Sequence, residues 1–266
     1  MSTYTTSDEE TIYYEHTPGS DALVFIHGWM HNHTIWKHEV KHFQKQGRAT
    51  LTIDLRGHGK SSTPQALDAY TMQRFAQDVH EVITHCELEN PTLIGHSLGG
   101  MIALTYLKEH PVKRLVLIDS AYENPAKHVA LAKNVNWTPI TQKLINYIQD
   151  KPRLKRRLGG VDYSNANKHL PTWLLGAKHS TPHVILSCLR EILHLDEEEL
   201  LKKIHSPTLI IAGEKDKQTP TSIAKKMHSQ ITTSKLVIIP DAEHDTPRTH
   251  PKKIIQALDE FLEAHP

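Results

Sequence analysis

The 266-residue sequence is poor in features that mark several protein classes. It has only two cysteines, Cys86 and Cys188, which are too few for a disulfide framework or a cysteine-rich metal site. No apolar run approaches the ~18 residues that a membrane-spanning helix needs, and the first ten residues do not resemble a secretion signal. Because reduced thiols are typical of the cytosol, we expect a cytoplasmic protein without an integral membrane segment.

The sequence also lacks an excess of charge of either sign. Its 31 lysines and arginines nearly balance its 30 acidic residues, for a formal net charge of +1. This balance gives no electrostatic reason to expect a nucleic acid partner. One local basic stretch is interpreted as a solvated face, with contact to an anionic substrate or a membrane surface as the alternative; it contains Lys151, Arg153, Lys155, Arg156 and Arg157.

Histidine is abundant, with 21 residues, but the histidines are not organised as metal ligands. The sequence has no HExxH motif and no paired cysteine and histidine spacing, so no metal site is predicted. Most histidines are interpreted as surface residues, among them His31, His33, His38, His42, His80, His85 and His110.

Short β-rich runs alternate with longer helical patterns, which predicts an α/β fold with a mostly parallel central sheet flanked by helices. The predicted strands are 3–6, 11–16, 23–27, 48–55, 91–95, 113–119, 207–213 and 235–240. The predicted helices are 34–46, 70–87, 98–109, 221–230 and 251–263. The first two strands flank a turn-like segment and are expected to form a hairpin.

The alternation stops in the middle of the chain. Residues 122–205 contain helical patterns separated by prolines and glycines, and no clear strand. A structureless loop of that length is improbable inside a compact domain. We therefore predict one α/β core made of residues 1–121 and 206–266, with residues 122–205 inserted as a helical cap.

The most specific motif is Gly95-His96-Ser97-Leu98-Gly99, which fits the pattern G-x-S-x-G. It follows a predicted strand and opens a predicted helix, which is the context that the motif requires. A serine hydroxyl is a weak nucleophile unless it is exposed and a neighbouring base removes its proton. The sharp strand-to-helix turn would expose Ser97, because the flanking glycines relieve crowding.

The base is predicted to be His244, which follows the last predicted strand. Loops after parallel strands gather at one edge of the sheet, so Ser97 and His244 can meet there. A carboxylate must orient the imidazole. Asp216, after the strand 207–213, is the main candidate, and Asp119 is the alternative.

Two backbone N–H groups are expected to stabilise the oxyanion. One belongs to Leu98, after the nucleophile, and the other to Trp29, in the loop after the first central strand. The Trp29 ring is interpreted as part of the acyl pocket, with core packing as the alternative. Further candidates for the pocket wall are His27, Gly28, His96, Trp137 and Trp173, although His96 is also expected to turn into the fold beneath the serine.

With these motifs the chain resembles the α/β-hydrolase superfamily over nearly its whole length, in particular its cofactor-free esterase, lactonase and C–C hydrolase members. The resemblance rests on His27-Gly28, residues 54–61, the Ser97 motif, residues 213–216 and His244. It implies the α/β-hydrolase fold, an oxyanion hole from Leu98 and Trp29, and a cap between the sixth and seventh strands. Haloalkane dehalogenases and epoxide hydrolases have aspartate in place of Ser97, which argues against those activities.

The predicted activity is hydrolysis of a small or medium carboxylic ester through an acyl-enzyme on Ser97, without a cofactor. The same triad could serve a lactonase, a C–C bond hydrolase or a perhydrolase. A ligand receptor of this fold with slow turnover is the alternative from another functional class. The expected partner is a small-molecule ester or lactone, and the sequence leaves the oligomeric state open.

Overall fold

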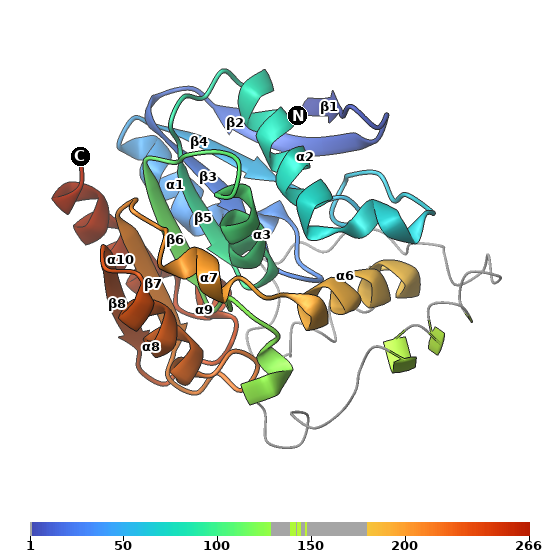
Figure 1. The fold of residues 1–266 in the computed structure, drawn as a ribbon. Helices are drawn as coiled ribbons and strands as arrows, with labels where there is room; N and C mark the ends of the chain where they lie inside the picture. The colour runs from blue at the N-terminus through green and yellow to red at the C-terminus, as the bar shows by residue number, and fades with distance from the viewer. Residues whose placement is uncertain (1, 129–138, 142, 145–146, 148–179) are drawn as a thin grey trace.

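A computed structural model describes residues 2–128, 139–141, 143–144, 147 and 180–266 (Figure 1). The strands are β1 (Ser2–Thr5), β2 (Thr11–Thr17), β3 (Ser20–Ile26), β4 (Arg48–Ile53), β5 (Thr92–His96), β6 (Arg114–Ile118), β7 (Thr208–Gly213) and β8 (Ser234–Ile239). The α-helices are α1 (Lys37–Lys45), α2 (Met72–His85), α3 (Leu98–Tyr106), α6 (Pro182–His194), α7 (Glu198–Leu201), α8 (Thr221–Gln230), α9 (Thr246–Thr249) and α10 (Pro251–Ala264). The 3-10 helices are η1 (His33–Trp36), η2 (Leu67–Tyr70) and η3 (Pro125–His128).

The strands form one sheet in the order β1-β2-β4-β3-β5-β6-β7-β8. β1 and β2 pair antiparallel, as the predicted hairpin requires, and β2 also runs antiparallel to β4. Every other neighbouring pair is parallel. The carboxyl ends of β3 to β8 therefore share one edge of the sheet, and the loops at that edge carry the candidate site.

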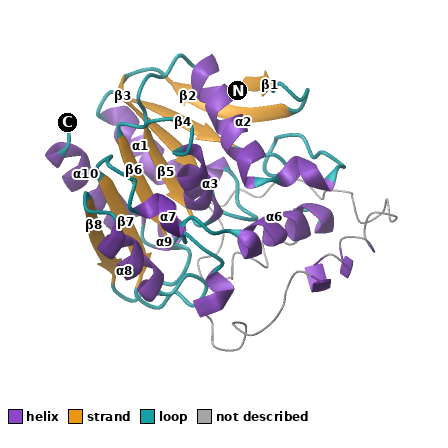
Figure 2. Cartoon of the chain, in the orientation of Figure 1, coloured by secondary structure: helices purple, strands orange, loops and turns teal. Residues whose placement is uncertain are grey.

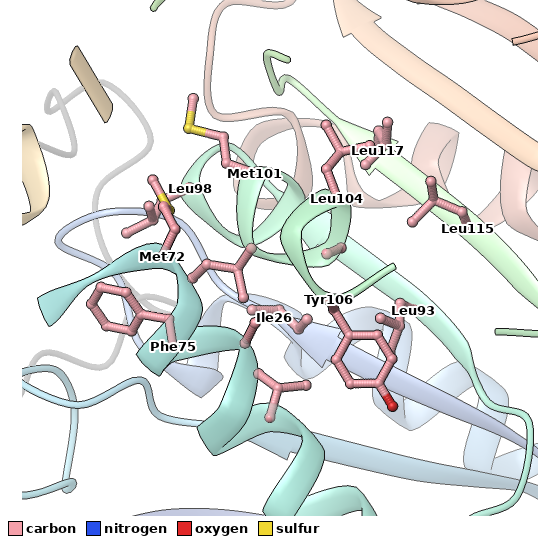
Figure 3. Packing of buried hydrophobic residues seen from close by; sticks show 14 of the residues in the cluster. Ile26, Met72, Phe75, Leu93, Leu98, Met101, Leu104, Tyr106, Leu115 and Leu117 are labelled. Atoms are coloured by element: carbon pink, nitrogen blue, oxygen red, sulfur yellow. The ribbon is translucent and has the colours of Figure 1, made fainter. Parts of the chain in front are cut away.

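Both faces of the sheet are buried beneath helices, as Figure 2 shows. Successive side chains of a strand point to opposite faces. Val24 and Ile26 of β3 join the cluster that includes α2, α3 and α8, while Leu23 and Phe25 join the cluster on α1 and α10. Figure 3 shows the first cluster, in which side chains from α2 and α3 pack against the central strands. This two-sided burial explains why the central strands read as continuous apolar runs.

The predicted helix over 34–46 is divided in the structure. Its first turn is the 3-10 helix η1, and the α-helix α1 begins at Lys37. The Asn32 side chain accepts a hydrogen bond from the Thr34 N–H and begins the element. The helix α2 begins in the same way, because Thr71 accepts from the Arg74 N–H.

Two of the histidines expected at the surface are buried, which corrects that interpretation. His31 and His33 are 5% and 8% exposed. His33 Nδ1 lies 2.8 Å from the buried Asp54 carboxylate, and His31 Nε2 lies 3.5 Å from Asp245. His31 lies in the loop after β3 and His33 begins η1, and no sequence periodicity indicates their burial.

The chain between β6 and β7 corresponds to the predicted cap. Its two ends lie together, since Glu123 and Asp196 form an antiparallel bridge. The helix α6 packs against the segment before α2: His183 Nε2 lies 3.1 Å from the Pro64 carbonyl oxygen, and the Met72 N–H donates to Glu191. The basic stretch 151–157 lies outside the described residues, and the cap over 122–205 stays a prediction.

Candidate active site

Ser97 occupies a strained turn between β5 and α3. Its backbone has φ 51° and ψ −116°, a region that side-chain-bearing residues rarely adopt. The close approach of the chain explains the flanking glycines. A Cβ on Gly95 would lie 2.4 Å from the Gly99 carbonyl oxygen, and one on Gly99 would lie 2.2 Å from that of Ile26. The turn therefore positions Ser97 at the carboxyl edge of the sheet, beside the end of β3.

A hydrogen-bonded chain joins Ser97, His244 and Asp216. Ser97 Oγ and His244 Nε2 are 2.9 Å apart, and His244 Nδ1 lies 2.8 Å from Asp216 Oδ2. The three residues follow β5, β8 and β7, and the fold brings them together from 147 and 28 residues apart in sequence. This is the geometry that a serine nucleophile and its base require.

The Asp216 carboxylate is held by several donors. Oδ1 accepts from the N–H groups of Gln218 and Thr219, and Oδ2 accepts from the Thr219 hydroxyl at 2.6 Å. Burial opposes ionisation of Asp216, but the hydrogen bonds and the nearby His244 outweigh it and lower the pKa of the carboxyl. The buried carboxylate is therefore ionised near neutral pH and can orient an imidazolium. Thr219 was not predicted from the sequence, and its position three residues after Asp216 is the signal that could have indicated it.

His244 has the electrostatic environment of a general base. Burial lowers the pKa of its imidazole, but the hydrogen bond and the charge of Asp216 raise it more, so the pKa lies above its ordinary value of 6.5. The side chain is 15% exposed, so a proton can reach it from solvent or from a bound substrate.

Asp119, the alternative carboxylate, lies in the same region with different partners. Its oxygens accept from the Gly213 N–H at 2.9 Å and from the Thr246 N–H and hydroxyl at 3.1 and 2.7 Å. Burial raises the pKa of Asp119 to about 7. The structure thus places Asp216, and not Asp119, on the imidazole. Asp119 instead ties the end of β7 to the residues that follow His244.

The two candidate oxyanion donors lie on neighbouring segments. Leu98 is the first residue of α3, so its backbone N–H has no partner within the helix. Trp29 follows β3, and its backbone N–H donates to no other described residue. The loop carrying Trp29 turns through a bond from the His31 N–H to the Gly28 carbonyl at 3.1 Å. The Trp29 ring is partly buried and packs against the core cluster, which is in keeping with the core-packing interpretation.

Two candidates for the pocket wall, His27 and His96, are fully buried. His27 is fully buried: its Nδ1 lies 2.8 Å from the Gly28 carbonyl oxygen, and its Nε2 accepts from the Leu55 N–H at 3.0 Å. His96 is also fully buried, and its Nε2 lies 2.9 Å from the His244 carbonyl oxygen. Both side chains are enclosed at the sheet edge and hydrogen-bond to loops of the site, and their contact with substrate stays a prediction. Trp137 and Trp173 lie outside the described residues.

Gly28 contacts His96 closely. A Cβ at this position would lie 2.7 Å from His96 Nδ1 and 3.1 Å from His31 Nδ1. Glycine therefore lets the loop after β3 pack against the turn that carries Ser97. The predicted contact of Gly28 with substrate stays a prediction.

Comparison with known proteins identifies the family of this chain. The family model of the alpha/beta hydrolase fold matches residues 21–251. The chain belongs to the α/β-hydrolase family. Within the part of this hydrolase that the structure describes, no cluster of three or more histidines, cysteines or carboxylates is arranged to hold a metal ion. No helix among the described residues is long and apolar enough to cross a membrane.

Several relatives match the hydrolase along almost its full length. The AB hydrolase superfamily protein YisY of Bacillus subtilis is 28% identical, covering 96% of this chain and 97% of YisY. The bifunctional esterase/perhydrolase DCH of Acinetobacter calcoaceticus is also 28% identical, covering 98% and 99%. Among solved structures, the esterase EaEST of Exiguobacterium antarcticum has a TM-score of 0.77 at 27% identity, with 98% of both chains covered.

Proposed function

We propose that this α/β-hydrolase cleaves small to medium carboxylic esters through an acyl-enzyme on Ser97. The observation that carries the proposal is the hydrogen-bonded chain from Ser97 through His244 to Asp216, with distances of 2.9 and 2.8 Å. The name of EaEST, an esterase at 27% identity over 98% of the chain, is in keeping with it.

In the proposed acylation step, His244 Nε2 takes the proton of Ser97 as Oγ attacks the ester carbonyl. Asp216 stabilises the resulting imidazolium and keeps Nδ1 protonated. The imidazolium then gives its proton to the departing alkoxide, so that the alcohol leaves and the acyl-enzyme remains. In deacylation, His244 takes a proton from water as the water oxygen attacks the acyl carbon. The imidazolium then gives that proton to Ser97 Oγ as the bond from Oγ to the acyl carbon breaks and the acid leaves.

The oxyanion of each tetrahedral intermediate would accept from the backbone N–H groups of Leu98 and Trp29. Donors already in position require no reorganisation during the reaction. One such donor contributes about 3–4 kcal/mol of transition-state stabilisation in a well-studied serine protease. The close packing of Gly28 on His96 supports this role, because it holds the Trp29 loop beside the turn that carries Ser97.

A perhydrolase is the second candidate, favoured by the similarity to the esterase/perhydrolase DCH. Hydrogen peroxide would replace water in the second step and release a peroxy acid. Lactone and C–C bond hydrolysis use the same triad and stay open, as does a receptor with slow turnover. These functions differ in substrate or in rate.

The test is hydrolysis of p-nitrophenyl esters from acetate to long acyl chains by the wild type and Ser97→Ala. We expect turnover by the wild type, loss of turnover in Ser97→Ala, and a chain-length preference that reports the size of the pocket. Rapid quenching followed by peptide mass spectrometry should find the acyl group on the peptide that contains Ser97. An acyl group on another residue would overturn the proposed nucleophile.

Two further measurements separate the alternatives. Peroxy acid formation from acetate and hydrogen peroxide, lost in Ser97→Ala, would identify a perhydrolase. A very slow wild-type turnover on every ester and lactone, together with a thermal shift caused by one ligand, would favour a receptor over an enzyme.

A further inference from the structure

A groove lined by basic side chains lies between α1 and α10, in addition to the candidate active site. Its cavity volume is about 560 Å³. The lining includes four lysines and three histidines but no carboxylate: His38, Lys41, His42, Lys45, Thr249, His250, Pro251, Lys252, Lys253 and Ile255. Since the chain as a whole carries a formal net charge of only +1, this is a local concentration of positive charge.

The α1 side of the groove brings like charges close together. The lining residues His38, Lys41, His42 and Lys45 follow one another at spacings that place them on one face. Lys41 and Lys45 are four residues apart, where like charges repel and destabilise a helix. The one carboxylate of α1, Glu39, does not compensate them, because it is fully buried and burial raises its pKa to about 8.

The α10 side is also unfavourable. Lys252 and Lys253 lie in the first turn of α10, near the positive end of the helix dipole, where anions are preferred to cations. The three carboxylates of this helix lie further along it, and two of them have partners: Asp259 lies 2.8 Å from His42, and Glu260 lies 3.2 Å from Lys235.

None of the four groove lysines forms an ion pair with a described residue. Asp241, whose charge acts on Lys253, is paired with Lys215 at 2.7 Å. The first turn of α10 therefore carries two lysines and no carboxylate, and α1 places Lys41 and Lys45 on the surface that the two helices share. A local concentration of like charge that departs from these rules is a candidate functional site.

We propose that this groove binds a small molecule that carries several phosphate groups. Lysine acts as a point charge for phosphate oxygens, and such a ligand would relieve the repulsion on both helices at once. The volume of about 560 Å³ lies within the range of small-molecule sites, ~300–1,000 Å³. A concave groove fits a compact anion better than a flat bilayer surface.

The groove is distinct from the candidate active site but close to it along the chain. His250 follows His244 by six residues, so their Cα atoms are at most ~20 Å apart. None of the groove residues belongs to the Ser97, His244 and Asp216 chain. Binding there does not depend on the proposed hydrolase function, and we expect Ser97→Ala to bind the same ligands as the wild type.

The experiment is calorimetric titration of the full-length protein with inorganic triphosphate and with ADP, at about 50 mM and about 300 mM salt. The test variant is the double substitution Lys41→Gln and Lys252→Gln. The control is Lys203→Gln and Lys225→Gln, which removes the same charge from exposed lysines outside the groove lining. Vesicles with and without an anionic phospholipid distinguish a lipid headgroup from a free phosphate.

We expect saturable binding of triphosphate, with a Kd of about 100 µM or lower at the lower salt concentration and weaker binding at the higher one. The groove variant should bind about tenfold more weakly, while the control should stay within about twofold of the wild type. Thermal unfolding should show that the groove variant folds at least as stably as the wild type, because repulsion is removed.

Absence of saturable triphosphate binding, or equal weakening in both double variants, would overturn the proposal. If the protein binds anionic vesicles but not triphosphate or ADP, and only the groove variant loses this binding, the proposal of a small-molecule ligand is overturned. The groove would then bind the phosphate of a lipid headgroup.

Discussion

Replacing Asp216 by asparagine tests the proposed triad most directly, because the structure dictates how the amide must lie. Oδ1 of Asp216 accepts from two backbone N–H groups, those of Gln218 and Thr219, so an amide nitrogen there would meet two donors. The amide nitrogen should therefore occupy the Oδ2 position, facing Nδ1 of His244.

In that position the amide N–H donates to Nδ1 and leaves the imidazole proton on Nε2. This tautomer cannot accept the proton of Ser97. In a serine protease the corresponding substitution lowers kcat by about 10⁴-fold, equivalent to ~5 kcal/mol, and we expect a loss of that order. Because the variant lacks the carboxylate that raises the pKa of His244, the acid limb of its remaining activity should shift to a lower pH.

Asp119→Asn is the matched control, since Asp119 is equally buried and close to the same loops. An asparagine at this position has one acceptor oxygen in place of two, so it can accept only some of the hydrogen bonds from Gly213 and Thr246. One lost acceptor for a buried donor costs about 1–3 kcal/mol of stability. We expect a lower Tm, with kcat within about tenfold of the wild type once the protein is folded.

The assay is kcat/KM for p-nitrophenyl acetate between about pH 5 and pH 9 for the wild type and both variants, with thermal unfolding in parallel. The wild type should lose activity with an acid-limb midpoint above 6.5, since protonation of His244 removes the base and its pKa is raised. Near-normal activity of Asp216→Asn, or an equal loss in Asp119→Asn, would refute the assignment of the third residue.

Three further substitutions test packing and electrostatics. Gly99→Ala places a Cβ 2.2 Å from the Ile26 carbonyl oxygen, which is backbone, so we expect a loss of about 3 kcal/mol or more in unfolding free energy, measured with urea. His96→Gln can still donate to the His244 carbonyl and should keep most activity. His96→Leu should lower kcat about a hundredfold, because it frees the loop that carries His244. Similar kinetics for the two variants would count against the hydrogen bond from His96 to the His244 carbonyl. Glu39→Gln should match the wild type in unfolding free energy below about pH 4.5 and exceed it increasingly as the pH rises towards 8. The reason is that the unfolded state releases the Glu39 proton over that range, whereas the folded state keeps it. A constant difference in urea titrations at several pH values would show that Glu39 is not protonated in the folded protein.

Much of the fold follows from patterns that are local in sequence. The apolar runs at residues 23–27 and 207–213 are strands buried on both faces, and burial on both faces leaves a continuous run that can be recognised without a structure. The turn at Ser97 is equally local, because it needs a strand, a helix and glycines within a few residues. Its catalytic role stays a proposal, but its position and strained backbone were predictable.

The relation between distant residues was not predictable in the same way. Asp119 and Asp216 both follow strands and suit the chemistry, and only the paths of the two loops place Asp216 on His244. His31 was interpreted as a surface residue and His27 as a pocket residue, yet the meeting of several strand-end loops buries both. Burial and hydrogen-bond partners depend on which segments meet at an edge, and one-dimensional periodicity does not record that. The basic groove has the same origin: the sequence predicts two separate helices at these positions, and only tertiary packing brings their lysines to one surface.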